Sequence, residues 1–431
     1  MPDADTQVVL VDGCRTPFRR AGTDYADLIS YDLARSVLKG ISVRNALDVT
    51  QVDAVIMGSV IQNPSTSNIA RDAALAAGFP NTVVAYTLTM ACISSSRAIA
   101  DGMNLIKSGQ AEIVIAGGVE MLSDVPIGFK KEVRKKFFEA RKYSSPLQYA
   151  RFLKGLRSSD LLPRAPEIAE YSTGEAMGES ADKLAAGFGV SREAQDAFAL
   201  RSHQLAARAT QDGKLVPEIC PIAVPPSFKA LRDDNTIRTD TSMERLSKLA
   251  PAFVKPFGTV TAGNSSPLTD GAAATLLMSE DRALELGYQP KAILREQVFV
   301  AQDPNEELLL GPAYAVPTVL DRLGLSFTDL EVIEVHEAFA GQVLAVLAAL
   351  ESETFAREKL ARTSKVADIE LDRVNRWGGS ISLGHPFGAT GARLMTTATN
   401  RLWAEDGHFA LVTSCAAGGL GYATIVERYG A

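Results

Sequence analysis

The strongest constraint on the fold of this chain is a pattern that occurs twice. Each half contains an apolar strand, a turn with a chemically reactive side chain, a helical run, a second apolar strand and a pair of glycines. The strands cover residues 52–58 and 111–118 in the first half, and 329–335 and 408–414 in the second. Continuous apolar strands between helices are typical of sheets that are buried on both faces. The pattern therefore predicts two α/β domains of the same topology, packed face to face so that their reactive turns meet at the shared boundary.

The rest of the chain is arranged around this repeat. Residues 125–246 break the pattern, because they are rich in charge and short helices, including one that Ser191 can cap and Gly213 can end. The apolar strand at 271–279 then returns the chain to the first domain. We therefore expect three parts: an N-terminal domain of residues 1–124 plus 247–281, an inserted helical loop domain at 125–246, and a C-terminal domain at 282–431.

Composition and charge exclude several classes of protein. With 431 residues, 46% of them apolar, the chain can bury a large core. Its net charge of -7 disfavours binding to nucleic acid. Four cysteines without a CxxC spacing argue against a disulfide framework and against a structural zinc site. No apolar run approaches the ~20 residues of a membrane span and the first residues do not resemble a signal peptide, so we expect a cytoplasmic location.

Three reactive side chains lie where an apolar strand gives way to a turn of small residues. They are Cys92 in MACISSSRA, His385 in SLGHPFGATGAR and Cys415 in VTSCAAGGLGYA. One thiol can hold an acyl group as a thioester, an imidazole can take the proton of that thiol, and a second thiol can move another proton. Because Cys92 is expected at the first turn of a helix, the helix dipole should lower the pKa of its thiol. Taken singly, a buried cysteine or histidine is more often structural, so the hypothesis depends on all three residues converging.

The segments around these residues resemble the signature regions of the thiolase family. That family has a Cys-x-Ser turn in its first third and Gly-His-Pro followed by Cys-x-x-Gly-Gly near its end. Further family segments match in the expected order at 177–182 (MGESAD), 258–266 (GTVTAGNSS) and 336–339 (HEAF). The resemblance implies the duplicated, layered αβαβα fold of thiolases.

The resemblance also implies catalytic roles. Cys92 would be the nucleophile, His385 its base, and Cys415 the group that protonates the departing acetyl-CoA carbanion. His385 would also stabilise the thioester oxygen, together with the group at the HEAF position. There His336 stands where most thiolases have asparagine, and it would donate directly or through a water molecule. The backbone amides of Cys92 and Ala417 would stabilise the tetrahedral intermediate.

Coenzyme A is implied as a substrate, and no permanently bound cofactor or metal is expected. By resemblance Ser266 and Met177 would contact its pantetheine arm, Arg238 would lie near its adenine, and Ala417 and Gly418 would contribute from their turn. A zinc site of His336, Glu337, His385 and Cys415 is the less favoured alternative, because HEAF lacks the second histidine of a HExxH helix.

A basic stretch points to a subfamily and to partners. Residues 129–157 contain ten Lys or Arg against two Asp or Glu, and Phe129, Val133 and Phe137 recur at helical spacing. Together with HEAF, this insertion resembles the β subunits of the trifunctional fatty-acid oxidation enzyme. It could contact a membrane surface or a hydratase/dehydrogenase α subunit, or simply cover the enzyme and steer anionic substrates.

The resemblance implies a 3-ketoacyl-CoA thiolase of fatty-acid β-oxidation that uses ping-pong covalent catalysis on Cys92. Two alternatives remain open: a biosynthetic acetoacetyl-CoA thiolase or condensing enzyme, and a non-catalytic subunit that binds CoA or lipid. A homodimer or homotetramer is the expected assembly.

Overall fold

The computed structural model of the chain describes residues 6–150, 152, 154–166 and 168–431. Ten of its strands form one sheet, in the order β10-β11-β12-β9-β1-β8-β5-β3-β4, with β2 paired to β8. The strands of the first half are β1 (Val8–Arg15), β2 (Arg19–Arg20), β3 (Ala54–Gly58), β4 (Val84–Leu88), β5 (Ile113–Glu120) and β8 (Thr269–Ser279). Those of the second half are β9 (Ala292–Ala301), β10 (Leu330–Val335), β11 (Phe409–Ala416) and β12 (Leu420–Arg428), while β6 (Ile222–Val224) and β7 (Lys229–Leu231) form a separate hairpin.

The two halves of the sheet repeat one arrangement. In the first half β3 runs parallel to β5, and β8 and β1 follow in antiparallel pairing. In the second half β10 runs parallel to β11, and β12 and β9 follow in the same way. The halves meet where β1 pairs with β9, at Val9 with Ile293 and Leu10 with Ala292. The predicted duplication is therefore confirmed, and the two sheets are continuous along this short seam.

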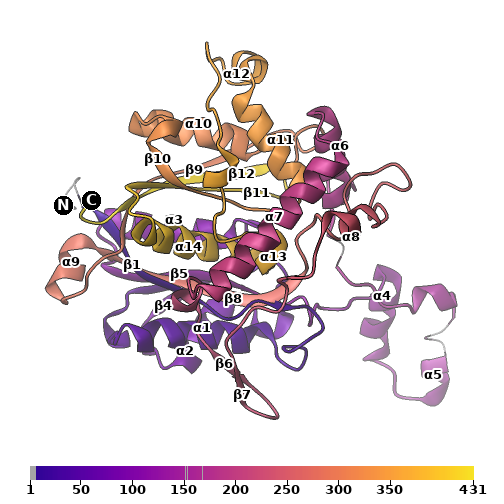
Figure 1. Cartoon of the computed structure of the whole chain (residues 1–431). Helices are drawn as coiled ribbons and strands as arrows, with labels where there is room; N and C mark the ends of the chain where they lie inside the picture. Colours follow the sequence, from indigo (N-terminus) through magenta and orange to yellow (C-terminus); the bar gives the residue numbers. More distant parts are fainter. Residues whose placement is uncertain (1–5, 151, 153, 167) are drawn as a thin grey trace.

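Helices cover both faces of each half-sheet and give five layers (Figure 1). In the central layer α3 (Ser94–Lys107) packs on β3 and β5, and α14 (Thr390–Ala404) packs on β10 and β11. The outer layers are α1 (Ser30–Arg44) with α2 (Ile69–Ala77), and α10 (Pro312–Leu323) with α11 (Ala340–Glu351). All eleven residues of β8 and all eight of β5 are buried, as their apolar sequences predict. The layered αβαβα fold expected from the sequence is confirmed.

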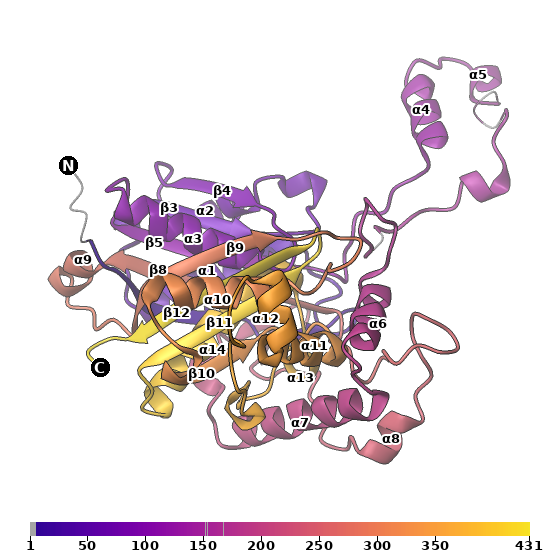
Figure 2. The ribbon, with the colours of Figure 1, turned by 90° about the horizontal axis from the view of Figure 1, so that it is seen from above.

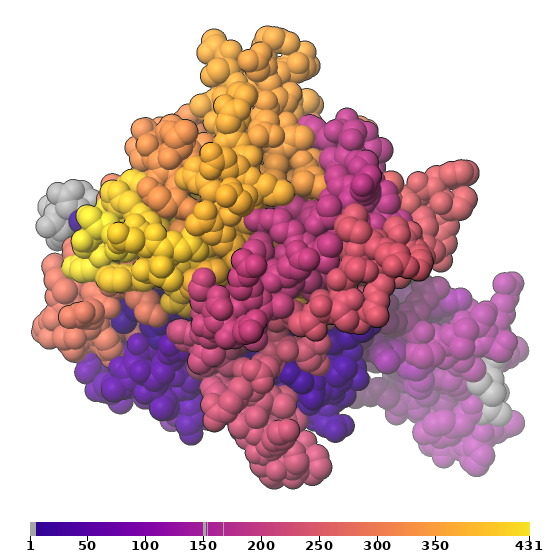
Figure 3. Space-filling view, viewed as in Figure 1, coloured from indigo at the N-terminus to yellow at the C-terminus, as the bar shows by residue number. Residues whose placement is uncertain are grey.

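The stretch at 125–246 divides into two parts in space. Residues 128–164, called the arm below, contain α4 (Lys131–Ala140) and α5 (Pro146–Ala150) and project from the body, as Figure 2 and the space-filling view in Figure 3 show. Paired backbone bonds between Gly128 and Arg164 close the base of the arm. The predicted continuation of the basic pattern includes Arg151 and Leu153, which lie outside the described residues.

The second part of this stretch packs on the body. It contains α6 (Met177–Gly187), α7 (Arg192–Gln211) and α8 (Met243–Ser247). Both α6 and α7 lie against α11 of the second half, and α7 also contacts α13 (Ser380–Leu383). Ser191 caps α7 by accepting from the amide of Ala194, as predicted, and Gly213 follows its end with φ 73°. The remaining helices are α9 (Glu280–Glu285) and α12 (Glu353–Lys359). Within the described ranges, none of the helices has both the length and the apolar character that spanning a bilayer requires.

Candidate active site

Cys92 and His385 meet between the two halves. Cys92 lies in the turn that joins β4 to α3, and His385 lies in the loop between α13 and α14. The Nε2 atom of His385 is 3.3 Å from the Cys92 Sγ atom. Ala91 adopts a left-handed conformation, with φ 46°, and the Ser94 side chain holds this turn through the amide of Met90. A left-handed conformation is energetically unfavourable for a residue other than glycine, and such strained residues are typical of turns at functional sites.

Direct backbone contact brings the two loops together. A methyl group added to Gly118 of β5 would lie 1.9 Å from the carbonyl oxygen of Gly388, and one added to Gly388 would lie 2.8 Å from that of Gly58. The buried carboxylate of Glu120 accepts hydrogen bonds from the amide of Gly388 at 3.0 Å and from the amide of Ile61 at 2.9 Å. Glycine at these positions therefore allows the His385 loop to rest on the first half of the sheet.

The hydrogen bonds of His385 fix its tautomer. Its Nδ1 atom is 2.7 Å from the Thr390 hydroxyl, which donates its single hydrogen to the carbonyl of Pro386 at 3.3 Å. The hydroxyl therefore accepts from Nδ1–H, and Nε2 is left bare toward Cys92. This tautomer can take the proton of the thiol.

Burial sets the charge state of the pair. It raises the pKa of the Cys92 thiol to about 12, although hydrogen bonds from the backbone amides of Ala417 and of Cys92 itself lower it. Burial, and then the charge of Arg393, lowers the pKa of His385 to about 3. The predicted lowering of the pKa of Cys92 is therefore wrong, because Cys92 precedes α3 in a half-buried turn, where the desolvation of its thiol outweighs the amide donors. The site therefore pairs a neutral thiol with a neutral base.

His336 joins this pair. It follows β10, is fully buried, and its ring centroid lies 4.1 Å from that of His385. Its Nδ1 atom is 2.9 Å from the Ser380 hydroxyl, whereas Nε2 has no hydrogen-bond partner among the described residues. One nitrogen of each imidazole and the Cys92 Sγ atom lie within 4.8 Å of one another. Burial, the neighbouring His385 and Arg393 all lower the pKa of His336, so this ring is neutral as well.

Cys415 reaches the same place from β11. It is buried, and its pKa is raised first by desolvation and then by the charge of Cys92 when that thiol ionises. The turn after it contributes the Ala417 amide described above, while the amide of Gly418 donates to Glu170 at 2.8 Å. Cys415 is therefore a protonated thiol at neutral pH, suited to giving up a proton.

The residues expected to bind coenzyme A lie on separate segments of the chain. The amide of Ser266 donates to the carbonyl of Ala338 in the HEAF segment, and Leu268, two residues later, forms a bridge with His385. Met177 begins α6, where Gly178 packs on the Phe253 ring. Arg238 is exposed, and its backbone amide donates to Nδ1 of His203.

Glu337 does not face the Cys92–His385 pair. Its carboxylate accepts from Ser202, Asn375 and the amide of Ile381, which hold it against α7 and α13. The alternative zinc set therefore loses its carboxylate. Cys92, His336 and His385 bear atoms that a metal could use, but the hydrogen bond between the thiol and a bare imidazole nitrogen matches acid–base chemistry.

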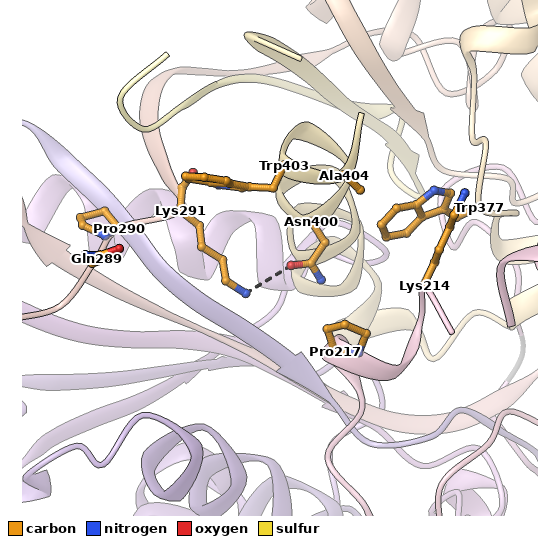
Figure 4. A pocket seen from close by; sticks show the side chains of 9 residues that line it. All are labelled: Lys214, Pro217, Gln289, Pro290, Lys291, Trp377, Asn400, Trp403 and Ala404. Atoms are coloured by element: carbon orange, nitrogen blue, oxygen red, sulfur yellow. Dashed lines mark hydrogen bonds between the residues drawn. The ribbon is translucent and has the colours of Figure 1, made fainter. Parts of the chain in front are cut away.

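A surface cleft of about 550 Å³ lies away from these residues. Figure 4 shows Trp377 and Trp403 on opposite sides of it, with the Lys291 ammonium bonded to Asn400. It contains none of the predicted site residues, so volume alone does not identify the reactive centre.

Several residues of this centre were not predicted. Thr390, Ser380, Arg393 and Glu120 orient the predicted groups, and each is fully buried. Thr390 and Arg393 follow His385 closely in ATGAR, which offered a weak signal. For Glu120 no signal in the sequence was available, because its partners come from distant turns.

Comparisons with known proteins agree with this geometry. Residues 8–281 match the family described as thiolase, N-terminal domain, and residues 288–428 match thiolase, C-terminal domain. The chain is 51% identical to the mitochondrial trifunctional enzyme subunit beta of Rattus norvegicus, over 98% of this chain and 88% of that protein. It is 45% identical to a 3-ketoacyl-CoA thiolase of Yersinia pestis (strain Pestoides F), over 98% and 97%. Its fold matches the crystal structure of human mitochondrial 3-ketoacyl-CoA thiolase with a TM-score of 0.84 and 30% identity, over 98% and 99% of the chains.

Proposed function

This chain belongs to the thiolase family, and from that premise we propose that it cleaves 3-ketoacyl-CoA with free coenzyme A in fatty-acid β-oxidation. The products are acetyl-CoA and a shortened acyl-CoA. Relatives named 3-ketoacyl-CoA thiolase, similar over nearly their whole length, support this choice of substrate.

The first half-reaction transfers the acyl group to Cys92. Nε2 of His385 takes the thiol proton as the sulfur attacks the keto carbon of the substrate. The tetrahedral oxyanion that forms accepts hydrogen bonds from the backbone amides of Cys92 and Ala417. The bond between C2 and C3 then breaks and its electron pair stays on C2. Cys415 gives its proton to that carbon, which releases acetyl-CoA and leaves acyl-Cys92. The neutral state of Cys92, His385 and Cys415 supports this order of proton transfers.

The second half-reaction returns the groups to their starting state. The Cys415 thiolate takes the proton of incoming coenzyme A, whose sulfur attacks the acyl-Cys92 thioester. The Cys92 thiolate leaves and recovers its proton from His385. In the first half-reaction the unpartnered Nε2 of His336 is available as a donor to the thioester oxygen of the departing acetyl unit.

The 3.3 Å contact between a bare Nε2 and the Cys92 thiol carries this proposal. The direct test mixes the protein with a 3-ketoacyl-CoA and no free coenzyme A, and then measures intact mass. We expect one acyl group on Cys92 and none in Cys92→Ala. An unlabelled wild-type chain together with unchanged 3-ketoacyl-CoA absorbance after coenzyme A is added would instead support a non-catalytic binding subunit.

The direction of the reaction separates the remaining alternative. A biosynthetic enzyme would condense two acetyl-CoA molecules at a kcat/KM comparable to that for cleaving acetoacetyl-CoA. We expect cleavage of longer 3-ketoacyl-CoA substrates to have the higher kcat/KM, which a chain-length series measures.

We also propose that the arm contacts an anionic membrane surface. The arm carries the cations of α4, and it exposes Phe138, Leu147 and Leu162, which are 67%, 72% and 63% accessible. Exposed apolar side chains among cations on a projecting element are typical of an interfacial membrane contact.

Vesicle flotation tests this contact. The wild-type chain should float with vesicles that contain anionic phosphatidylglycerol and should stay behind with neutral ones. Lys131→Glu with Lys135→Glu should abolish flotation, whereas Lys39→Glu with Lys229→Glu, a matched change elsewhere on the surface, should not. Equal flotation of both variants would argue against a membrane contact through the arm and leave an α subunit as the partner of the arm.

For the assembly we propose a homodimer that pairs β4 with its copy. This strand lies at the end of the sheet, and Val84 on it is exposed. A free strand edge can pair with a second chain. Light scattering should give the dimer mass for the wild type and the monomer mass for Tyr86→Pro, because proline removes a donor from the strand.

A further inference from the structure

The unpartnered Nε2 of His336 requires an explanation, because a buried polar atom without a hydrogen bond is unfavourable. His336 is fully buried beside the reactive pair. Which of its nitrogens carries hydrogen decides what it can do. A ring protonated on Nε2 is a donor toward the site, whereas a ring protonated on Nδ1 would be an acceptor there.

Two buried residues set this tautomer. The Nη2 atom of Arg393 is 2.7 Å from the Ser380 Oγ atom, and that oxygen is 2.9 Å from Nδ1 of His336. A guanidinium can only donate, so Ser380 must accept from Arg393. The single hydrogen of Ser380 then points to His336, since no other acceptor for it is found among the described residues. The arrangement that pairs this hydrogen has His336 accepting at Nδ1 and carrying its own hydrogen on Nε2, whereas the other tautomer would leave the buried Ser380 hydrogen without an acceptor.

We propose that Ser380 and Arg393 are positioning residues that hold His336 as a neutral ring protonated on Nε2, with this N–H presented to the thioester oxygen of the substrate. This inference rests on the proposed thiolase reaction and names residues that act through His336 rather than on the substrate. Arg393 lies on α14, and its Nη1 atom is 3.8 Å from the Glu334 carboxylate. Its Nε and Nη1 atoms have no hydrogen-bond partner in the described part of the chain, so its hydrogen bond to Ser380 is not shared with another side chain.

The chain of hydrogen bonds from Arg393 through Ser380 to His336, called the relay below, explains why the N–H of His336 is in place before substrate arrives. The rings of His336 and His385 lie 4.1 Å apart, and Ser380 begins the short helix that leads into the His385 loop. The relay acts on the ring of His336 and Thr390 acts on the ring of His385, so the two Nε2 atoms have opposite roles. One Nε2 is a donor, the other an acceptor, and no rearrangement is needed when an oxyanion forms.

Nitrogen-15 NMR of the histidine rings tests the relay without requiring turnover. The chain has only four histidines, so the signals of His336 can be assigned with His336→Gln. We expect the wild type to show a protonated Nε2 and a bare Nδ1 at neutral pH. Ser380→Ala should give a mixture of tautomers, and Ser380→Thr, which keeps the hydroxyl, should restore the wild-type pattern. Ser382→Ala removes a hydroxyl from the same helix without touching His336 and should leave the pattern unchanged.

Kinetics gives the second measurement. Ser380→Ala should lower kcat about 10- to 100-fold, less than the loss of an oxyanion donor outright, with KM little changed and with normal alkylation of Cys92 by iodoacetamide. A wild-type ring protonated on Nδ1, or an Ser380→Ala variant with both the wild-type pattern and the wild-type kcat, would overturn the inference. A wild-type chain that shows the expected tautomer but cleaves no 3-ketoacyl-CoA would overturn the proposed function and not the relay.

Discussion

Replacing Thr390 with valine tests whether the tautomer of His385 controls acylation. Valine keeps the shape of threonine but removes the hydroxyl that accepts from Nδ1–H at 2.7 Å. Leaving that buried N–H unsatisfied costs about 1–3 kcal/mol, which is the energy that now favours the productive tautomer. Since about 1.4 kcal/mol corresponds to a factor of ten, the acylation rate should fall about 5- to 150-fold. The free energy of unfolding should fall by a similar 1–3 kcal/mol.

Thr399→Val is the matched control for this experiment. Thr399 lies on the same helix, is buried, and donates to the carbonyl of Met395 at 2.9 Å, as Thr390 does to Pro386. Its loss should cost about 1 kcal/mol of stability and leave acylation unchanged. Acyl-Cys92 formation is followed by quenched-flow mass spectrometry, and unfolding by urea titration. Equal acylation rates in the two variants, despite a stability loss at Thr390, would refute the tautomer reasoning.

Further predictions concern the contacts that hold the two loops. Burial raises the pKa of Glu120 from 4.5 to about 7, so the folded chain binds this proton more tightly and its unfolding free energy should fall by about 3 kcal/mol as pH rises between these values. Urea titrations should show that Glu120→Gln lacks this share of the fall, and an unaltered pH dependence would count against a titrating Glu120. Gly118→Ala should lower both the melting temperature and the acylation rate, because its methyl group meets the Gly388 carbonyl at 1.9 Å; a fully active, equally stable variant would disprove that close approach. Glu170→Ala should lower kcat without changing the melting temperature, since it frees the Gly418 amide, and an unchanged kcat would show that this contact does not position the turn.

The sequence predicted the layered fold because its signal is carried by local patterns. Apolar strands flanking a helical run occur at matching places in both halves, and burial of β5 and β8 follows directly from their composition. The seam between β1 and β9 was not predicted, because only two residue pairs form it. The position of α6 and α7 against α11 was not predicted either, since their packing depends on contacts between distant segments.

The reactive groups could be named from the sequence, but their electrostatics could not. A cysteine before a helix suggests a lowered pKa, and only the packing of distant segments around the thiol shows that desolvation prevails for Cys92. The tautomers likewise depend on the hydroxyls of Thr390 and Ser380. Threonine and serine are common residues, and no motif in the sequence around these two indicates that they contact a histidine. Their importance lies in atoms 2.7 to 2.9 Å from the two rings. The roles that the sequence suggests for Cys415 and for the coenzyme A contacts stay predictions.

The protonated resting state of Cys92 has a consequence for the survival of the protein under oxidative stress. Peroxides attack thiolates, and their rate on a neutral thiol is far lower. Because the pKa of the Cys92 thiol is raised to about 12, little thiolate is present at neutral pH, and we expect its oxidation to sulfenic acid to be slow. Such a chain combines a slowly oxidised resting state with a sulfur that becomes strongly nucleophilic when His385 takes its proton.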